Sequence, residues 1–187
     1  MRVLLTCGPT WVPIDSVRII SNRSTGQMGA LIVRELKKSG ALVTEIKGPL
    51  FFDDFKTALK RELRKKYDVV IHAAAVSDFK AAAGGKGKLD STKALTLRLV
   101  PTEKLINSIK KISPGSFLVG FKLEPDLNAR NIFSKTRGLF AQSGCDLVVA
   151  NTLKRGYKGF IVDADGKVLA QANNKQAIAN DLVKLIL

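Results

Sequence analysis

The sequence alternates short apolar runs with amphipathic helical patterns from Val3 to Ala150. The strand-like runs are Val3–Cys7, Leu42–Ile46, Val69–His72, Leu95–Val100, Phe117–Phe121 and Leu147–Ala150. Helical spacing of apolar residues occurs between them, at Gln27–Lys38, Phe52–Lys66, Thr102–Ile112 and Asn128–Gln142. Such alternation predicts βαβ units with right-handed crossovers. We therefore expect a doubly wound, mostly parallel α/β sheet of the Rossmann-like kind.

The C-terminal part of the chain follows a different pattern. Two runs, Gly159–Val162 and Lys167–Ala172, flank the turn signal Asp163-Ala164-Asp165-Gly166, which predicts a β-hairpin. A final helix is expected from about Lys175. Neither a repeat nor a low-complexity linker interrupts the sequence, so residues 1–187 are expected to form a single domain.

The chain is strongly basic, with 31 Lys and Arg residues against 16 Asp and Glu and a net charge of +15. This charge suits phosphorylated small molecules, and it also suits nucleic acid. Aromatic residues make up only 6% of the sequence, which leaves few side chains for base stacking, and the sequence contains no recognised nucleic-acid-binding motif. A nucleic-acid-binding module is therefore an alternative, and nucleic acid is not the expected partner.

The apolar runs and the cysteine and histidine content exclude several classes of protein. No apolar run approaches the ~20 residues of a membrane span, so no membrane partner is expected. The two cysteines, Cys7 and Cys145, and the one histidine, His72, offer neither a disulfide framework nor an all-protein metal site. This cysteine usage predicts a cytoplasmic location.

The polar segment Asp15–Gly29 lies between the first strand and the first helix. Its hydroxyls and backbone N–H groups fall at a helix N-terminus, where an anion is stabilised. The glycine spacing does not fit G-x-G-x-x-G, which weighs against the alternative of a nicotinamide-dependent reductase. A loop that only binds phosphate needs neither Asn22 nor Arg23. The segment therefore predicts a substrate-binding site rather than a simple phosphate loop.

Small residues follow the strand Val69–His72 at the expected carboxyl edge of the sheet, where ligands of doubly wound proteins bind. Ala73–Ala75 leave room for a flat ligand against the backbone, and Asp78 can accept hydrogen bonds from a ribose or a base. Phe121, at the end of another apolar run, can cover a nucleobase. We interpret His72 as a packed strand residue rather than a general base.

A glycine-rich, lysine-bearing segment, Asp78–Lys93, interrupts the alternation. We interpret it as a mobile flap on the carboxyl edge of the sheet. Lys86 and Lys88 on this flap can neutralise negative charge on a triphosphate.

Six motifs occur in the order typical of one enzyme family. They are Gly8-Pro9-Thr10, Asp15–Gly29, Ala74–Asp78, Lys88-Leu89-Asp90-Ser91-Thr92, Gly120-Phe121-Lys122-Leu123-Glu124 and Asp146–Asn151. On these motifs the chain resembles, over nearly its whole length, the phosphopantothenoylcysteine synthetases of coenzyme A biosynthesis, in the stand-alone form without the fused flavin-dependent decarboxylase. The resemblance implies that the chain needs no flavin and that a separate decarboxylase is a candidate partner.

The resemblance implies a ligase that works in two steps. The carboxylate of 4′-phosphopantothenate attacks the α-phosphorus of a nucleoside triphosphate, which forms an acyl-nucleotide and releases pyrophosphate. The amine of L-cysteine then displaces the nucleotide and forms an amide. Members of the family use Mg²⁺ held largely through the triphosphate. They are homodimers whose active sites draw on both subunits.

The resemblance also assigns roles to individual residues. Asn22 matches the asparagine that holds the acyl-nucleotide and supports the second step. Lys88 matches the flap lysine of the first step, with Lys86 as the alternative. Arg18 and Ala75 match substrate-contacting positions. The expected nucleotide-binding residues are Gly8, Thr10, Ala73, Ala74, Asp78, Lys86, Lys88, Phe121 and Arg137.

The sequence departs from the family pattern at three places, one of which is Thr152 after Asn151, where many bacterial members have aspartate. The stretch after Gly48-Pro49 is short, so an edge strand of the family is expected to be missing. Lysines that family members carry in the helix before Asp146 are replaced by Gly138 or Leu139 and by Ser143, and Arg137 is the expected substitute. CTP is favoured as the nucleotide, with ATP as the alternative, and a family member that has lost activity is a further alternative.

Overall fold

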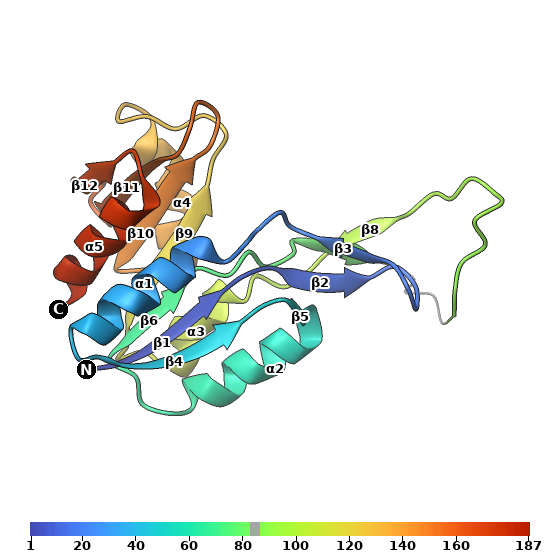
Figure 1. Cartoon of the computed structure of the whole chain (residues 1–187), viewed down its shortest axis with the longest axis horizontal. Coiled ribbons are helices and arrows are strands. Elements are labelled where there is room, and N and C mark those ends of the chain that lie inside the picture. The colour runs from blue at the N-terminus through green and yellow to red at the C-terminus, as the bar shows by residue number, and fades with distance from the viewer. Residues whose placement is uncertain (83–86) are drawn as a thin grey trace.

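The computed structural model describes residues 1–82 and 87–187 and has a seven-stranded sheet at its centre (Figure 1). Five strands are parallel, in the spatial order β10, β9, β6, β1, β4, and the antiparallel hairpin β11–β12 extends the β10 edge. The strands are β1 Arg2–Cys7, β4 Leu42–Lys47, β6 Val69–His72, β9 Phe117–Leu123, β10 Leu147–Thr152, β11 Lys158–Asp163 and β12 Val168–Ala172. The predicted mostly parallel α/β sheet and its C-terminal hairpin are confirmed.

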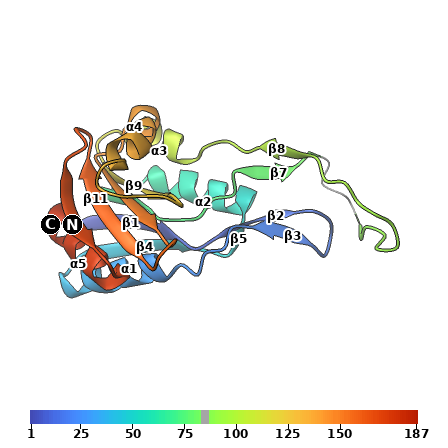
Figure 2. The ribbon, with the colours of Figure 1, turned by 90° about the horizontal axis from the view of Figure 1, so that it is seen from above.

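Helices cover both faces of this sheet (Figure 2). They are α1 (Gln27–Lys38) and α5 (Lys175–Ile186) on one face, and α2 (Phe52–Leu63), α3 (Ile106–Ile112) and α4 (Ile132–Ser143) on the other. Successive strand residues point to opposite faces, so Leu4 packs with α2 and Leu5 packs with α1, and both are fully buried. No helix in the two described stretches is long and apolar enough to cross a membrane.

Five short strands form an arm that projects from the carboxyl edge of the central sheet (Figure 1). They are β2 (Thr10–Pro13), β3 (Ile19–Ser21), β5 (Leu50–Phe51), β7 (Phe79–Ala81) and β8 (Leu99–Pro101). β2 pairs with β3 and β5, and β7 pairs with β8. We use "the arm" for these strands together with residues 14–18 and 87–98, and "the body" for the seven-stranded sheet and its helices.

Two predictions are wrong in the arm. The run Leu95–Val100 is not a strand of the central sheet: only its last two residues belong to a strand, β8, and Leu95 and Leu97 stay exposed. An alternating pattern fits a strand of the arm as well as a strand of the body, so periodicity does not separate them. The polar segment Asp15–Gly29 contains the strand β3, and the short stretch after Pro49 forms the two-residue strand β5 of the arm.

Two glycines let α1 begin directly beside the end of β1. Gly29 lies so close to β1 that a Cβ there would come within 2.2 Å of the Cys7 Cβ. Gly8 has φ +83° and lies against the backbone of Gly48, a conformation that glycine adopts without steric cost. These contacts place the N-terminus of α1 at the carboxyl edge of the sheet.

Candidate functional site

A cleft of about 940 Å³ opens at the carboxyl ends of β6, β9 and β10, beside the first residues of α1 and α5. The sequence-predicted site residues in its lining are Asn22, Ala73, Ala74, Ala75, Asp78 and Phe121. Basic residues that were not predicted as site residues also line it: Arg23, Lys104, Lys122 and Lys175. The sheet therefore brings the alanine run, the asparagine and the aromatic ring together. They meet at the carboxyl edge, where ligands of doubly wound proteins bind.

The loop before α1 leaves the first turn of this helix available to an anion. Gly26 is the N-cap residue, with φ +70°, and no side chain caps the helix there. The first turn contains no acidic residue. Ser24, Thr25 and Gln27 line the cleft beside it. Backbone N–H groups and the positive end of the helix dipole are thus accessible to a phosphate or carboxylate in the cleft.

The side chain of Asn22 is held in one orientation by the loop that follows β6. Its Nδ2 donates to the carbonyl oxygens of Ala75, at 3.3 Å, and Val76, at 3.0 Å. Because both amide hydrogens are engaged, the Oδ1 atom is what this residue offers to a ligand. The arrangement presents an oriented hydrogen-bond acceptor at the cleft.

Gly8 and Thr10 do not line the cleft. They hold in place the segment after β6, which does line it. The buried Thr10 hydroxyl accepts from the Ser77 N–H at 2.8 Å and donates to the Ser77 Oγ at 3.1 Å. The Gly8 carbonyl accepts from the Ala75 N–H at 2.9 Å. The segment after β1 therefore fixes the segment after β6, which carries the alanine run.

His72 is a packed strand residue, as the sequence indicated. Its Nδ1 lies 2.9 Å from the Thr6 Oγ1, and its ring packs near Phe55. Burial lowers the pKa of the imidazole to about 4, because the charged form would lose its hydration. The ring is neutral near pH 7 and brings no positive charge to the cleft.

Two of the cleft lysines have carboxylate partners. The Lys104 Nζ lies 2.5 Å from the Asp78 Oδ1, and the Lys122 Nζ lies 3.2 Å from the Glu124 Oε1. The sequence offered a signal for Lys122, which belongs to the motif at the end of β9. It offered none for Lys104, which reaches the cleft because the chain returns along the arm from β8 to α3.

Asp15 connects the two halves of the arm, although sequence analysis did not single out its side chain. The buried carboxylate accepts from the N–H groups of Leu89 at 3.0 Å, Val17 at 2.8 Å and Arg18 at 2.6 Å. The Arg18 guanidinium donates to it as well, at 2.6 Å. These contacts, with the Leu89 hydrogen bond foremost, lower the pKa of Asp15 to about 2. The sequence signal that could have identified Asp15 is the preference of aspartate for loops, where its side chain accepts hydrogen bonds from nearby backbone N–H groups.

Arg18 and Lys88 lie on the arm and outside the cleft of their own chain. Arg18 donates to the Leu89 carbonyl at 3.4 Å, and the Gly87 carbonyl accepts from the Ser16 N–H at 3.1 Å. The described part of the predicted flap therefore runs along the arm and away from the carboxyl edge (Figures 1 and 2).

Arg137 and Lys86 are the remaining residues that were predicted to bind the nucleotide. Arg137 is exposed on α4 and is not among the residues that line it. Lys86 lies outside the described residues.

The fold and the cleft define an α/β protein with a ligand site at the carboxyl edge of parallel strands. The model of the family "DNA/pantothenate metabolism flavoprotein C-terminal domain" matches residues 1–187, and the chain belongs to this family. The resemblance seen in the sequence motifs is confirmed.

Relatives of known name agree with this assignment. The coenzyme A biosynthesis bifunctional protein CoaBC of Thermococcus kodakarensis is 43% identical over 167 residues, which are 82% of this chain and 41% of that protein. The protein of the same name from Methanocaldococcus jannaschii is 30% identical over 170 residues, 84% of this chain and 42% of that protein. The chain spans about two fifths of the length of these relatives.

Solved structures share the fold. The DNA/pantothenate metabolism flavoprotein from Streptococcus pneumoniae superposes with a TM-score of 0.83 at 26% identity, over 100% of this chain and 98% of that one. A Cab2 mutant in complex with phosphopantothenate-cysteine superposes with a TM-score of 0.81 over 99% of this chain and 84% of that one. At 17% identity, this second likeness concerns the fold alone.

Proposed function

We propose that this chain is a ligase that joins 4′-phosphopantothenate to L-cysteine through an acyl-nucleotide and releases pyrophosphate. Membership of the family and the names of the relatives support this activity. The observation that carries the proposal is the cleft in which Asn22, Ala73–Ala75 and the uncapped N-terminus of α1 meet. An anion-binding helix end, an oriented amide and a flat wall together suit a phosphorylated acid that is activated by a nucleotide.

In the first step, a carboxylate oxygen forms a bond to the α-phosphorus of the nucleotide, and the bond from that phosphorus to pyrophosphate breaks. The N-terminus of α1 is suited to hold phosphate oxygens, because its N–H groups and dipole favour negative charge. Ala73–Ala75 leave their backbone accessible to the base, and the Phe121 ring can lie against it.

In the second step, the cysteine nitrogen forms a bond to the acyl carbon, the nucleotide leaves with the electron pair of the broken C–O bond, and the nitrogen loses a proton. The Asn22 Oδ1 can accept a hydrogen bond from the attacking amine. Because the carbonyls of Ala75 and Val76 fix the amide, this acceptor is oriented before the amine arrives.

The residues of the cleft fit Mg²⁺ held mainly by triphosphate oxygens. The carboxylates in the lining are Asp78 and Glu103. Within residues 1–82 and 87–187, no three His, Cys, Asp or Glu side chains come together in a group that could hold a metal ion. Asp78 would add one oxygen ligand, and the bound ion would neutralise charge on the phosphates.

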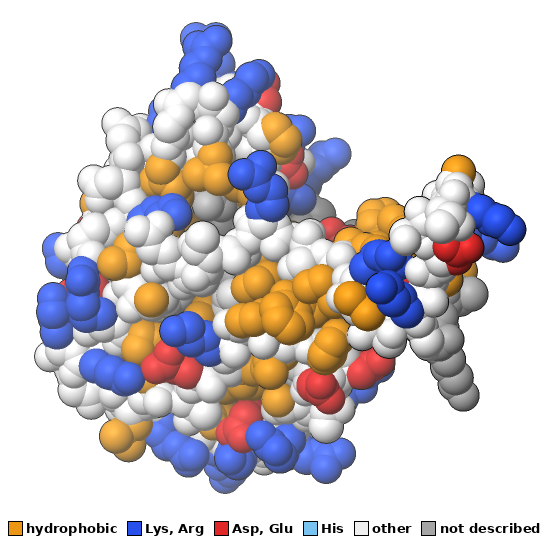
Figure 3. All heavy atoms as spheres, turned by 45° about the vertical axis from the view of Figure 1, so that its right-hand side comes forward, with side chains coloured by type: hydrophobic (Ala, Val, Ile, Leu, Met, Phe, Trp, Pro, Cys, Tyr) orange, Lys and Arg blue, Asp and Glu red, His pale blue; other side chains and the backbone are white. Residues whose placement is uncertain are grey.

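We further propose a homodimer in which the arm of one copy completes the cleft of the other. Arg18 and Lys88 lie on the arm and away from the cleft of their own chain. Hydrophobic side chains gather where the arm leaves the body (Figure 3). Exposed apolar residues of the arm are Val17, Ile19, Phe51, Phe79, Leu95, Leu97 and Leu99. Large exposed apolar patches are typical of protein interfaces, and a two-fold axis would let two arms exchange places.

A pyrophosphate-release assay tests the ligase. The purified chain is incubated with 4′-phosphopantothenate, L-cysteine, Mg²⁺ and each nucleoside triphosphate in turn. We expect release that requires phosphopantothenate, with CTP preferred over ATP, and amide product only when cysteine is present. Absence of pyrophosphate with every nucleotide would contradict the proposed function.

Mixing two inactive variants tests the shared site. Lys88→Gln removes the arm lysine, and Asn22→Asp alters the cleft. If the arm serves the partner's cleft, a heterodimer contains one wild-type site, and random mixing restores about a quarter of the wild-type activity. If each chain serves its own cleft, mixing restores none, and the proposed exchange of arms is wrong.

Two smaller proposals complete the assignment. A cytoplasmic location is supported by the cysteine usage, since Cys7 and Cys145 are both buried and offer no disulfide framework. A decarboxylase that consumes the amide product is the proposed functional partner, and the bifunctional names of the relatives support such a coupling.

A further inference from the structure

Lys175 occupies a corner of the cleft that the proposed function does not yet use. It is the first residue of α5, and its Nζ donates to the Gln27 Oε1 at 2.8 Å. Gln27 is the first residue of α1. The Lys175 Nζ also lies 5.9 Å from the centre of the Tyr157 ring. The ammonium group therefore lies where the two helices of one sheet face begin.

The partners of Lys175 differ from those of the other cleft lysines. Lys104 and Lys122 each contact a carboxylate, whereas Lys175 is held by a neutral amide and the face of an aromatic ring. Within the described residues, Lys175 is part of no carboxylate ion pair. To bind a ligand, Lys175 therefore has to give up only a hydrogen bond to a neutral amide and no ion pair.

The position of Lys175 is also electrostatically unfavourable in the empty protein. A cation at the start of a helix is repelled by the positive end of the helix dipole. The first turns of α1 and α5 contain no acidic residue that would offset this charge. An anion in this corner of the cleft would relieve the repulsion, so the site favours a negatively charged ligand.

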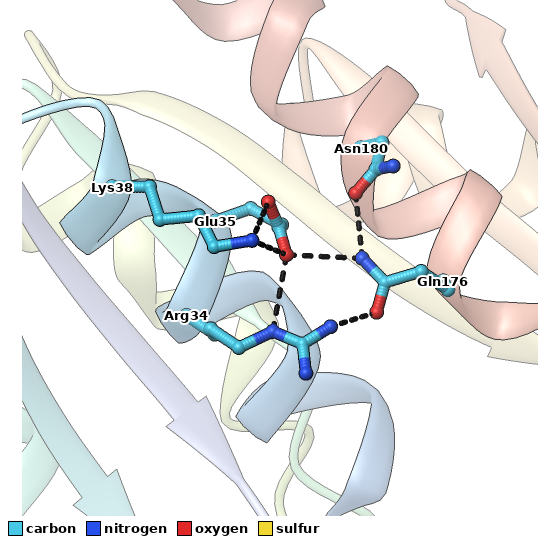
Figure 4. Close-up of polar contacts among 5 residues, drawn as sticks. All are labelled: Arg34, Glu35, Lys38, Gln176 and Asn180. Carbon is cyan, nitrogen blue, oxygen red and sulfur yellow. Dashed lines mark hydrogen bonds and ion pairs between the residues drawn. The ribbon is translucent and has the colours of Figure 1, made fainter.

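A polar network holds the two helices in the register that positions Lys175 (Figure 4). Glu35 of α1 accepts from Lys38 and from the Nε2 of Gln176, at 3.1 and 3.0 Å. The same Nε2 donates to the Asn180 Oδ1 at 2.6 Å, and Arg34 donates to the Gln176 Oε1. Since Gln176 follows Lys175 directly, the network fixes the first turn of α5 against α1.

The opposite wall supplies no comparable charge. α4 contributes Leu139 to the lining of the cleft, while its Arg137 is exposed outside it. The remaining basic residue of α4, Lys135, lies 3.5 Å from the Glu124 carboxylate. A polyphosphate in the cleft must therefore find its counter-charge elsewhere in the lining.

We propose that Lys175 binds the polyphosphate chain of the nucleoside triphosphate, exchanging the Gln27 amide for phosphate oxygens. The identity of the ligand rests on the proposed function. In the proposed site, the positive charge of Lys175 from α5 acts together with the N-terminus of α1 on the phosphates. Lys175 makes no covalent bond in either step. Its role is to hold the phosphates that leave as pyrophosphate.

Binding of inorganic tripolyphosphate, measured by calorimetry, tests the role of Lys175 without requiring turnover. We expect Lys175→Met to raise the Kd about tenfold at low salt, as loss of a charge-assisted contact does. The difference should shrink in 1 M NaCl, where charges are screened over about 3 Å. Lys175→Arg should restore most of the affinity. The matched control is Lys184→Met, which removes an exposed lysine of the same helix that does not line the cleft.

Thermal unfolding separates phosphate binding from a structural role. Lys175→Met should melt at the wild-type temperature or slightly above it, because it removes a cation from a helix N-terminus. A wild-type Kd in Lys175→Met, equal weakening in Lys184→Met, or a lowered melting temperature with no rescue of binding by Lys175→Arg would each overturn the proposal.

The pyrophosphate-release assay on the wild-type chain distinguishes this proposal from the proposed function. Turnover by the wild type with unaltered tripolyphosphate binding in Lys175→Met means that the ligase stands and the role of Lys175 is wrong. Lys175-dependent tripolyphosphate binding without turnover means that the phosphate site stands and the ligase is wrong. If the wild type neither binds nor turns over, both are wrong.

Discussion

The body and the arm differ in how their strands are stabilised. Strands of the body have four to seven residues and are covered by helices on both faces, whereas those of the arm have two to four residues and leave apolar side chains exposed. The body contains the cleft, and the arm carries Arg18 and Lys88. Under the proposed function, the cleft beside the body holds the nucleotide, while activation of the acid requires the body of one copy and the arm of the other to meet.

The largest expected effect separates binding from chemistry at the arm. We expect Lys88→Gln to slow formation of the acyl-nucleotide by about 1,000-fold, because a positive charge at the leaving phosphates is lost. Nucleotide affinity should fall much less, because the charge of Lys88 acts mainly on the leaving phosphates in the transition state. Rapid-quench measurement of pyrophosphate and calorimetry with the nucleotide give the two quantities.

The matched control is Lys93→Gln, which removes another exposed lysine of the same segment. It should react at nearly the wild-type rate. Equal losses in the two variants would show that the segment contributes only general positive charge, and the assigned role of Lys88 would then be wrong.

The next effect concerns the body and its stability toward acid. The pKa of His72 is about 4 in the folded protein and near 6.5 when unfolded. Between these values the unfolded chain binds a proton that the folded chain does not. The free energy of unfolding should therefore fall by up to about 3 kcal/mol as the pH drops from 6.5 to 4. Urea titrations at several pH values measure this slope, which His72→Gln should flatten; an unchanged slope in the variant would exclude His72 as its source.

A third effect separates the two steps of the reaction within the cleft. Asn22→Asp removes the Nδ2 donors that hold the side chain against the carbonyls of Ala75 and Val76. We expect the acyl-nucleotide to form, and its reaction with cysteine to slow by about 100-fold, because the acceptor for the amine is misplaced. Single-turnover experiments with and without cysteine measure the steps. A loss confined to the first step would reverse the roles given to Asn22 and Lys88.

The smallest expected effect concerns the contact that orders the arm. Asp15→Asn replaces the charged acceptor for the Leu89 N–H and should lower the rate of the first step by about tenfold, the loss of one charge-assisted hydrogen bond. Hydrogen exchange at the Leu89 amide should become faster in the variant. If exchange is unchanged, another contact orders the arm.

The pKa of Asp15 also makes the arm more resistant to acid than the body. Because its folded pKa is about 2, below the ordinary carboxyl value near 3.9, its contribution is present above pH 3.9 and is lost as the pH falls toward 2. Protection of the Leu89 amide should therefore persist at pH 5, where His72 already weakens the body.

The prediction from sequence succeeded where the local pattern was sufficient. The apolar runs Val3–Cys7 and Val69–His72 became strands β1 and β6, because a strand buried on both faces needs a nearly continuous apolar run. The run Leu95–Val100 failed, because the same alternation serves a strand in the projecting arm. The alanine run, Asn22 and Phe121 were placed in one cleft by the order of strands that such a topology imposes.

The sequence by itself determined the class of fold and the family, since periodicity and the order of motifs are properties of neighbouring residues. Only the tertiary structure decided that Lys88 lies on the arm, that the Asn22 amide is fixed by two carbonyls, and that Lys175 meets Gln27. Lys175 and Gln27 are 148 residues apart in the chain. Such contacts arise from the way helices pack on a shared sheet, and no local pattern encodes that packing.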